Sequence, residues 1–284
     1  MATHETSTPQ TEPPAKLHYS ATLMLFRDGP DGAPEVLLLE RSGKSESFGG
    51  AFVFPGGKVD LHDAHGDFEA LCAGLDDHRA SAILGVPRYG LAYWMGAIRE
   101  SFEEAGILLA YDRDGAIVRL HEPETKARFA DYRAALNRGE MTLLDICRRE
   151  DLRLATDQLL YYSHWVTPVP MPRRFDTRFF VCRAPEHQES IIDNHEAVSQ
   201  IWINPAEALR RAKEDDFAIF FPTIKNLEGI ARHRTTAELL IAVAAQTEFP
   251  RVLPLRVETA SGKPGVLLPG DPGYVYHEPA QTHY

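Results

Sequence analysis

The chain has 284 residues, of which 44% are hydrophobic and 25% charged, and its formal net charge at pH 7 is −11. This is an ordinary composition for a globular protein, and the acidic balance without a run of Lys or Arg argues against an extended nucleic-acid interface. Its three cysteines are too widely spaced to indicate a disulfide framework or a CxxC metal site, and no apolar stretch reaches the roughly 18 residues of a membrane span.

The N-terminal part begins with a Thr- and Pro-rich tail over residues 1–16, which we expect to be disordered and which lacks the apolar core of a signal peptide. Two strands are predicted over 17–27 and 35–41, and the Gly- and Pro-bearing segment between them favours a hairpin. A further short strand is predicted in AFVFPGGKVD at 51–60, where it runs into a Pro-Gly-Gly turn.

The rest of the chain mixes helix and strand signals without a regular βαβ alternation. Helices are predicted at 67–75, 91–105, 122–136, 141–150, 205–214 and 221–246. Strands are predicted at 107–112, 159–169, 173–183 and 199–204. This order predicts an α+β sandwich in a single domain over 17–284, which ends in an irregular, Pro- and Gly-rich extension over 248–284.

One predicted helix, in AIRESFEEAGILL at 97–109, has carboxylates along one side. Glu100, Glu103 and Glu104 fall together because residues three and four apart are neighbours on a helix, and the apolar residues gather opposite them. Like charges at this spacing repel one another unless a cation lies among them. The helix taken alone favours a solvated acidic face, with a divalent-metal site as the alternative.

The residues upstream favour the metal site. FPGGKVD supplies a tight turn whose glycines allow close backbone approach and whose carbonyls can face a cation. Followed by RESFEEAG, this turn resembles the signature of the Nudix hydrolases, in which the matching positions are Gly57, Arg99, Glu100, Glu103, Glu104 and Gly106.

The match departs from the family pattern in three places. The first glutamate of the pattern is absent, with Asp63 or Asp60 standing near its position, and a hydrophobic position is occupied by Ser101. About thirty extra residues, within 61–90, separate the two halves, which is tolerable because the entropy of loop closure grows slowly with length. Which aspartate holds Arg99 stays open at this point.

The interrupted signature is similar to that of one branch of the family, the peroxisomal coenzyme A diphosphatases and their bacterial relatives. LLLERS, HWVTPVPMPRRFDTRFFV and LLPGDPGY are similar as well, so the resemblance covers about residues 18–275. It implies the Nudix fold, a mixed β-sheet sandwiched between helices, with helical insertions in 61–90 and 122–150. The C-terminal THY differs from an S-K-L peroxisomal address, so we expect a cytoplasmic enzyme.

The resemblance implies metal-dependent hydrolysis of a nucleoside diphosphate linked to another moiety, with CoA or acyl-CoA as the first candidate. Two alternatives stay open, namely a diphosphatase for ADP-sugars or dinucleotides and a non-catalytic ligand-binding or regulatory Nudix domain. The complete RExxEE argues against the second of these. The expected partner is a small CoA-like molecule rather than a nucleic acid or a membrane, and self-association into a homodimer is left open.

The resemblance also assigns roles to the signature residues. Glu100 and Glu104, one helical turn apart, are expected to bind Mg²⁺ or Mn²⁺, and Gly57 is an expected further ligand. Glu103 is a third ligand or the residue that orients or deprotonates the attacking water. We place Arg99 with Glu103 and Glu104 in the catalytic group, through an ion pair that fixes the turn against the helix.

A late loop offers another metal ligand, for which Glu196 is preferred over Glu189 and Asp193 because relatives place a Glu shortly before a Trp-containing strand. The alternative for Glu196 is an ordinary solvated position on the loop.

Substrate contacts are expected from three arginines and from the insertion. Arginine's planar fork suits phosphate oxygens, so Arg173, Arg174 and Arg178 are predicted to bind the substrate, although one of them has Asp176 as an alternative partner. His164 and Trp165 are candidates for the pocket, with core packing as the favoured alternative. The apolar side chains of 61–90, Phe68, Leu71 and Leu75, are candidates for a wall of the groove.

Overall fold

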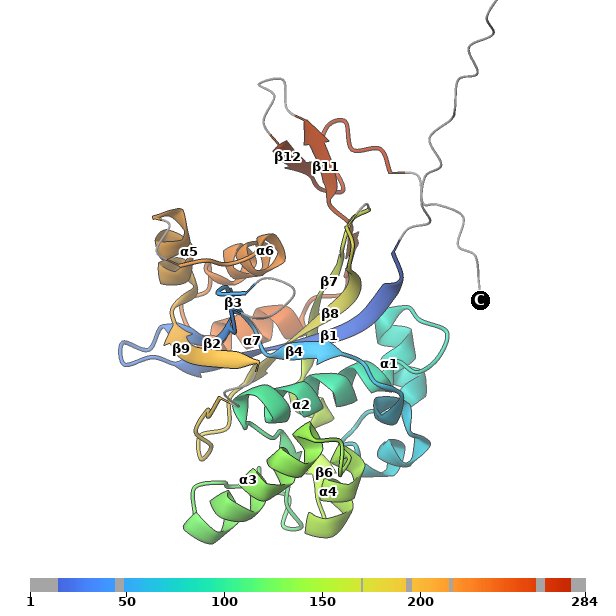
Figure 1. Cartoon of the computed structure of the whole chain (residues 1–284), viewed down its shortest axis with the longest axis vertical. Coiled ribbons are helices and arrows are strands. Elements are labelled where there is room, and N and C mark those ends of the chain that lie inside the picture. The colour runs from blue at the N-terminus through green and yellow to red at the C-terminus, as the bar shows by residue number, and fades with distance from the viewer. Residues whose placement is uncertain are drawn as a thin grey trace, which may run out of the picture.

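The computed structural model describes residues 15–43, 49–169, 171–192, 196–214, 217–258 and 264–276. Residues 1–14 of the predicted tail, Asp193 and the C-terminal Thr-His-Tyr lie outside these ranges. Within them, a mixed sheet has helices against both of its faces, which confirms the predicted α+β class (Figure 1). No helix in the described ranges is long and apolar enough to cross a membrane.

The main sheet contains eight strands in the described residues, and its continuous path runs β10–β7–β8–β1–β2–β3, with β4 paired to β1 and β9 to β2. The pairs β1–β8 and β10–β7 are parallel and the others are antiparallel. Its strands are β1 (Leu17–Asp28), β2 (Pro34–Arg41), β3 (Phe52–Val53), β4 (Gly56–Lys58), β7 (Leu160–Val166), β8 (Arg174–Arg183), β9 (Ala197–Ile203) and β10 (Arg251–Val252). The small pairs are β5 (Ala110–Tyr111) with β6 (Arg153–Leu154), and β11 (Leu255–Glu258) with β12 (Pro264–Leu267).

The helices divide between the two faces of the sheet. α1 (Asp77–Leu84), α2 (Leu91–Ala105), α3 (Pro123–Asn137) and α4 (Leu143–Glu150) lie on one side, and α5 (Pro205–Lys213), α6 (Phe221–Ile230) and α7 (Thr236–Ala244) lie on the other (Figure 1). Short 3-10 helices occur at η1 (Leu61–Ala64), η2 (Gly66–Leu71) and η3 (Thr156–Gln158).

The central strand β1 shows why two cores form. Its side chains alternate, so that Leu23 and Leu25 join the core beneath α2 while Met24 and Phe26 join the core beneath α5, α6 and α7. The predicted hairpin is present, with Phe26 opposite Val36 in the β1–β2 register.

The insertion 61–90 differs in detail from its prediction. The helix expected at 67–75 is the 3-10 helix η2, and α1 follows it. Asp76 begins α1 by accepting a hydrogen bond from the backbone N–H of Arg79. Helical periodicity missed α1 because its buried side chains are only Ala80, Ser81 and Leu84, which make a weak apolar pattern.

Two further segments differ from prediction. The helix expected over 221–246 is broken between α6 and α7, where the Thr235 hydroxyl accepts from the Glu238 N–H and caps a new helix. The extension 248–284, predicted to be irregular, contains β10, β11 and β12 in its described part. The β11–β12 hairpin pairs only with itself, and it projects from the end of the sheet (Figure 1).

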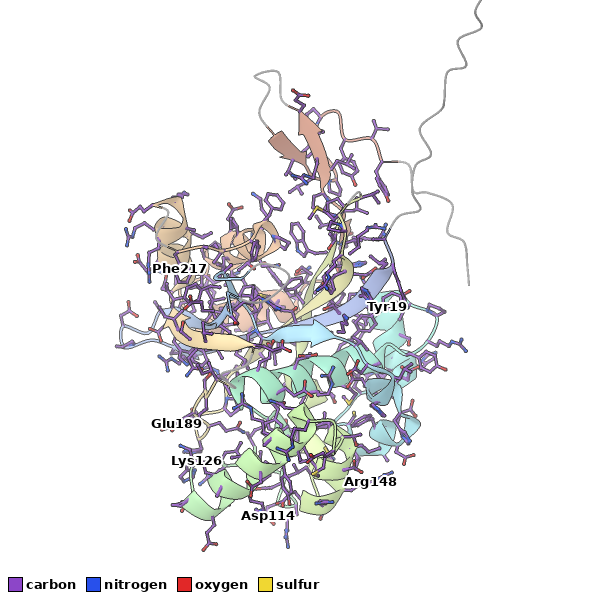
Figure 2. The ribbon with its side chains drawn as sticks, in the orientation of Figure 1. Tyr19, Asp114, Lys126, Arg148, Glu189 and Phe217 are labelled. Atoms are coloured by element: carbon purple, nitrogen blue, oxygen red, sulfur yellow. The ribbon has the colours of Figure 1, made fainter. Side chains whose placement is uncertain are left out.

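Side chains also connect the helical insertion to the late loop. Lys126 on α3 forms an ion pair with Glu189 at 2.9 Å, and both side chains lie at the lower edge of the molecule (Figure 2). This places the loop before β9 beside the C-terminal end of α2, where the backbone N–H of Ile191 donates to the carbonyl of Ala105.

Candidate active site

The helix α2 places the predicted carboxylates beside the glycine turn FPGGKVD. Its apolar side chains, among them Ile98 and Phe102, are buried in the core, and Gly106 ends the helix in the left-handed conformation at φ 69°. Glu100 and Glu103 line a cavity of about 1000 Å³, while Glu104 is buried and is not part of its wall.

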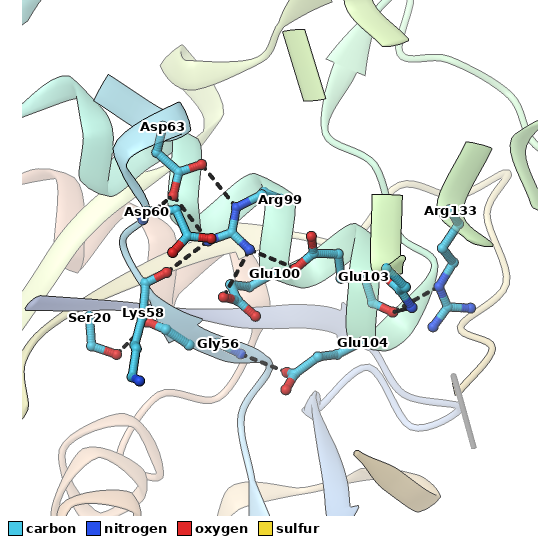
Figure 3. A network of polar contacts seen from close by, with 12 residues as sticks. Ser20, Gly56, Lys58, Asp60, Asp63, Arg99, Glu100, Glu103, Glu104 and Arg133 are labelled. Carbon is cyan, nitrogen blue, oxygen red and sulfur yellow. Dashed lines mark hydrogen bonds and ion pairs between the residues drawn. The ribbon is translucent and has the colours of Figure 1, made fainter. Parts of the chain in front are cut away.

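Arg99 connects the two halves of the signature (Figure 3). Its Nε and Nη2 atoms donate to the two carboxylate oxygens of Asp63 at 2.9 and 3.0 Å, and Nη2 also donates to the carbonyl of Lys58 at 2.7 Å. Asp60 is 3.8 Å away with its side chain 59% exposed, compared with 1% for Asp63. Asp63 is therefore the aspartate that holds Arg99.

The same guanidinium lies between two of the glutamates. Nη1 of Arg99 donates to Glu100 at 3.0 Å and to Glu103 at 2.6 Å. Burial raises the pKa of Glu100 to about 8, against the attraction of Arg99 and with repulsion from Glu103 adding to it. Burial also raises the pKa of Glu103. The carboxylates thus need a nearby positive charge to remain ionised.

Glu104 is held by the turn rather than by Arg99. Its Oε2 atom accepts a hydrogen bond from the backbone N–H of Gly56 at 2.8 Å (Figure 3). Burial and the charge of Glu100 raise its pKa well above the usual range, and the charge of Glu196 adds to this shift. Glu196, which comes from the late loop, therefore acts on the same carboxylate group.

Glycines are required in this turn because the chain passes close to other groups. A Cβ atom on Gly57 would collide with the carboxylate of Glu100, and one on Gly56 would lie 2.6 Å from the Cα of Thr22. The carbonyl of Gly57 accepts a hydrogen bond from the Ser20 hydroxyl.

This donor set fits a hard divalent ion. The carboxylate oxygens of Glu100, Glu103 and Glu104 and the carbonyl of Gly57 are the ligand types that Mg²⁺ and Mn²⁺ prefer. In the described residues no three His, Cys, Asp or Glu side chains already form a cage for an ion, and the guanidinium of Arg99 lies against two of the glutamates instead.

The cavity extends from the carboxylates across the sheet to the β11–β12 hairpin. Its acidic end contains Asp60, Glu100, Glu103 and Glu196. The cations on its wall are Arg41, Lys58, Arg173 and Arg256. The apolar part of its lining is mostly aromatic and consists of Phe54, Trp165, Val166, Phe175, Phe179, Phe220, Phe221, Pro254 and Val266.

The three arginines predicted to bind substrate do not point the same way. Arg173 lines the cavity. Arg174 and Arg178 are buried away from it: Arg174 donates to the carbonyl of Thr167 at 3.1 Å, and Arg178 lies 3.7 Å from Asp176. The alternative partner predicted for one arginine, Asp176, is thus the neighbour of Arg178.

Side chains alternate between the two faces of a strand, and this alternation separates the two pocket candidates on β7. Trp165 lines the cavity, whereas His164 is buried and bonds to Asp176 at 2.7 Å. In the insertion, Phe68 is buried in the core beneath α2, and Leu71 and Leu75 pack against that core. These three apolar residues therefore do not line the cavity.

Of the late-loop candidates, Glu196 lines the cavity, and Glu189 instead pairs with Lys126 on the surface. Asp193 lies outside the described residues.

Three cationic residues that line the cavity were not predicted from the sequence. Arg41 ends β2, and its charge opposes the rise in the pKa of Glu104. Lys58 directly follows the predicted glycine turn, so its place in the signature was a usable signal. Arg256 reaches the cavity from β11, a strand in the segment predicted to be irregular, and no local pattern indicated it.

Comparison with known proteins agrees with this geometry. A family model described as the NUDT19 Nudix domain matches residues 75–230. The acyl-coenzyme A diphosphatase NUDT19 of Xenopus laevis is 29% identical over 234 residues, which are 72% of this chain and 62% of that protein. The human protein of the same name is 28% identical over 303 residues, which are 95% of this chain and 76% of that protein.

A solved structure shows the same fold. The crystal structure of a Nudix hydrolase from Alicyclobacillus acidocaldarius aligns with a TM-score of 0.65 and 26% identity, covering 83% of this chain and 99% of that one. Together with the family match over more than half of the chain, this confirms the resemblance read from the glycine turn and the RESFEEAG helix. The chain belongs to the Nudix hydrolases, in the branch described by the NUDT19 Nudix domain.

Proposed function

We propose that this Nudix hydrolase is a metal-dependent diphosphatase whose substrate is coenzyme A or an acyl-CoA. The observation that carries the proposal is one cavity of about 1000 Å³ that joins a carboxylate end to an apolar, aromatic end. A diphosphate bound near the carboxylates would leave the nucleoside and the second moiety to contact the remaining walls. The names of the NUDT19 relatives support the same substrate class.

The protein's own groups have separable tasks in this reaction. Glu100 and Glu104, with the carbonyl of Gly57, would hold Mg²⁺ or Mn²⁺, and Glu196 is the late-loop candidate for a further ligand. Bound there, the metal ion supplies charge neutralisation at the phosphates and a lower pKa for a coordinated water. Arg99 holds the helix against the turn through Asp63, so that the carboxylates keep their relative positions.

Glu103 is the proposed group for the attacking water, since it lines the cavity and is less buried than Glu104. It orients the water or accepts its proton while the water oxygen attacks phosphorus. The phosphoanhydride bond to the other phosphate then breaks. With CoA the products are an adenosine bisphosphate and a phosphopantetheine, and one water is consumed.

A substrate panel tests the proposal. The purified chain is incubated with CoA, an acyl-CoA, ADP-ribose and a diadenosine polyphosphate, with Mg²⁺, Mn²⁺ or a chelator, and the products are identified by mass. We expect cleavage of CoA or acyl-CoA that the chelator abolishes. Cleavage of ADP-ribose or the dinucleotide without CoA would overturn the proposed substrate, and binding without any cleavage would favour a regulatory domain.

A further inference from the structure

Cations from separate segments of the chain line the cavity, one beside the glycine turn and one farther along the sheet. Lys58 and Arg173 both line the cavity, although they belong to β4 and to the segment just before β8. His18 on β1 lies between them in the sheet, and its ring is 5.9 Å from that of Phe175, which also lines the cavity.

The sheet register places these side chains on one face. Lys58 is opposite Ser20 in the β1–β4 pair, and His18 is beside Phe175 in the β1–β8 pair. Because side chains alternate along a strand, His18 and Ser20 point to the same face of β1. Arg173 precedes Phe175 by two residues, so in an extended chain its side chain points to the same face as that of Phe175.

The register also separates Arg173 from the metal-binding turn. Gly57, next to the carboxylate of Glu100, pairs with Ala21, whereas Leu17 pairs with Arg174 at the far end of the same strand. These levels are four residue steps apart along β1, about 13 Å at roughly 3.3 Å per residue. Arg173 therefore faces a part of a bound substrate other than the diphosphate at the carboxylates.

The positive charges of these cations act on His18. Partial burial lowers the pKa of His18, and the positive charges of Lys58, Lys16 and Arg173 lower it further. Each of these side chains is thus close enough to His18 to act on it, and they repel a positive charge on its ring. A bound anion would relieve this repulsion, which is a common property of sites that bind phosphate groups.

We propose that Arg173, with His18 beside it and the Lys58 side chain on the same face of the sheet, forms a second anion site that binds a phosphate monoester of the substrate distant from the scissile diphosphate. This inference rests on the proposed diphosphatase function and adds a requirement to it. The preferred substrate carries at least one phosphate group outside the diphosphate. A lysine ammonium and an arginine guanidinium suit a dianionic phosphate, because both donate charge-assisted hydrogen bonds.

Coenzyme A and dephospho-CoA test the site, since they differ only by one phosphate monoester. For the wild type we expect a higher kcat/KM with CoA. For Arg173→Ala we expect kcat/KM for CoA to fall about tenfold or more, with a much smaller change for dephospho-CoA. Equal losses on both substrates would overturn the site, because they would mean that Arg173 holds the diphosphate or the fold.

Two matched variants test whether the position of the positive charge decides the preference for CoA, rather than the presence of a positive charge alone. Arg183→Ala removes a cation from the same strand but at its other end, where Arg183 pairs with Asp28, and it should leave the ratio of the two substrates unchanged. Arg173→Lys keeps the charge and should recover part of the preference for CoA. If wild type cleaves neither compound, the proposed function fails; if it cleaves both equally well, only the anion site fails.

Discussion

Arg99 and Asp63 are 36 residues apart in sequence, yet the guanidinium of Arg99 donates to both carboxylate oxygens of Asp63. The insertion 61–90 thus supplies, from its 3-10 helix η1, the acidic group that closes the interrupted signature. The backbone N–H of Asp60 also donates to Asp63 at 2.8 Å, so this carboxylate holds the turn and the helix at once. A buried ion pair that loses one partner leaves the other charge uncompensated.

We predict that Asp63→Asn destabilises the fold and lowers activity, while Asp60→Asn has a small effect on both. Removing the buried charge should lower the free energy of unfolding by about 2 kcal/mol or more, because Arg99 stays buried and keeps fewer partners. Urea unfolding of both variants measures this. Equal destabilisation by the two substitutions would contradict the assignment of Asp63 as the partner of Arg99.

Glu104→Gln is predicted to nearly abolish turnover without weakening the metal-free fold. The raised pKa of Glu104 indicates that its charge is unfavourable in the absence of a cation, and glutamine keeps the volume and an oxygen for the N–H of Gly56. Thermal melting with and without Mn²⁺ supplies a second readout, since the variant should lose most of the metal-induced rise in Tm. Activity with unchanged metal dependence would exclude Glu104 as a ligand.

Arg133 on α3 is predicted to position Glu103. Its Nε atom donates to the backbone carbonyl of Glu103 at 2.9 Å, at the last turn of α2 (Figure 3). Arg133→Gln should lower kcat several-fold with a smaller change in KM, because the helix end that carries the catalytic carboxylate loses a charged hydrogen-bond donor.

The control for Arg133 is Arg138→Gln near the end of the same helix, where the arginine pairs with Glu140 on the surface. This variant should retain wild-type kcat. If both substitutions change kcat and Tm alike, the helical insertion has only a structural role.

Stability is predicted to fall at acid pH through the pair His164–Asp176. Burial lowers the pKa of His164 below its ordinary value of 6.5, so the unfolded chain binds this proton more readily and stability is lost as the pH falls below 6.5. Burial alone would raise the pKa of Asp176, but the hydrogen bond to His164 and the positive charges of His164, Arg178 and Arg251 together outweigh it and lower this pKa from 3.8. The contribution of Asp176 to the free energy of unfolding is therefore present above pH 3.8 and is lost as the pH falls through its lower folded-state pKa.

Unfolding free energies of wild type and His164→Gln between roughly pH 7.5 and 4.5, a range in which His164 titrates and Asp176 stays ionised, test this prediction. The variant cannot gain a proton at this position, so its stability should depend less steeply on pH below 6.5. Parallel curves for the two proteins would show that the buried histidine does not control the acid response.

The sequence by itself determined the features that depend on neighbouring residues. The spacing of Glu100, Glu103 and Glu104 required a common helical side, and the glycine turn indicated a close backbone approach, as the structure shows for Gly57. The β1–β2 hairpin and the two helices in 122–150 also followed from local periodicity and turn residues. These signals are local because helix and turn geometry relate residues only a few positions apart.

Tertiary structure decided what local patterns leave undetermined. Strand alternation puts Arg174 and Arg178 on one face of the sheet and Arg173 on the other. It does not say which face has the cavity, and the packing of α2 against one face and α6 near the other decides this. The choice of Asp63 over Asp60 likewise required the folded insertion, since both are close to the turn in sequence. Contacts between distant segments depend on how the layers pack, and side-chain periodicity carries no information about the partner that each face meets.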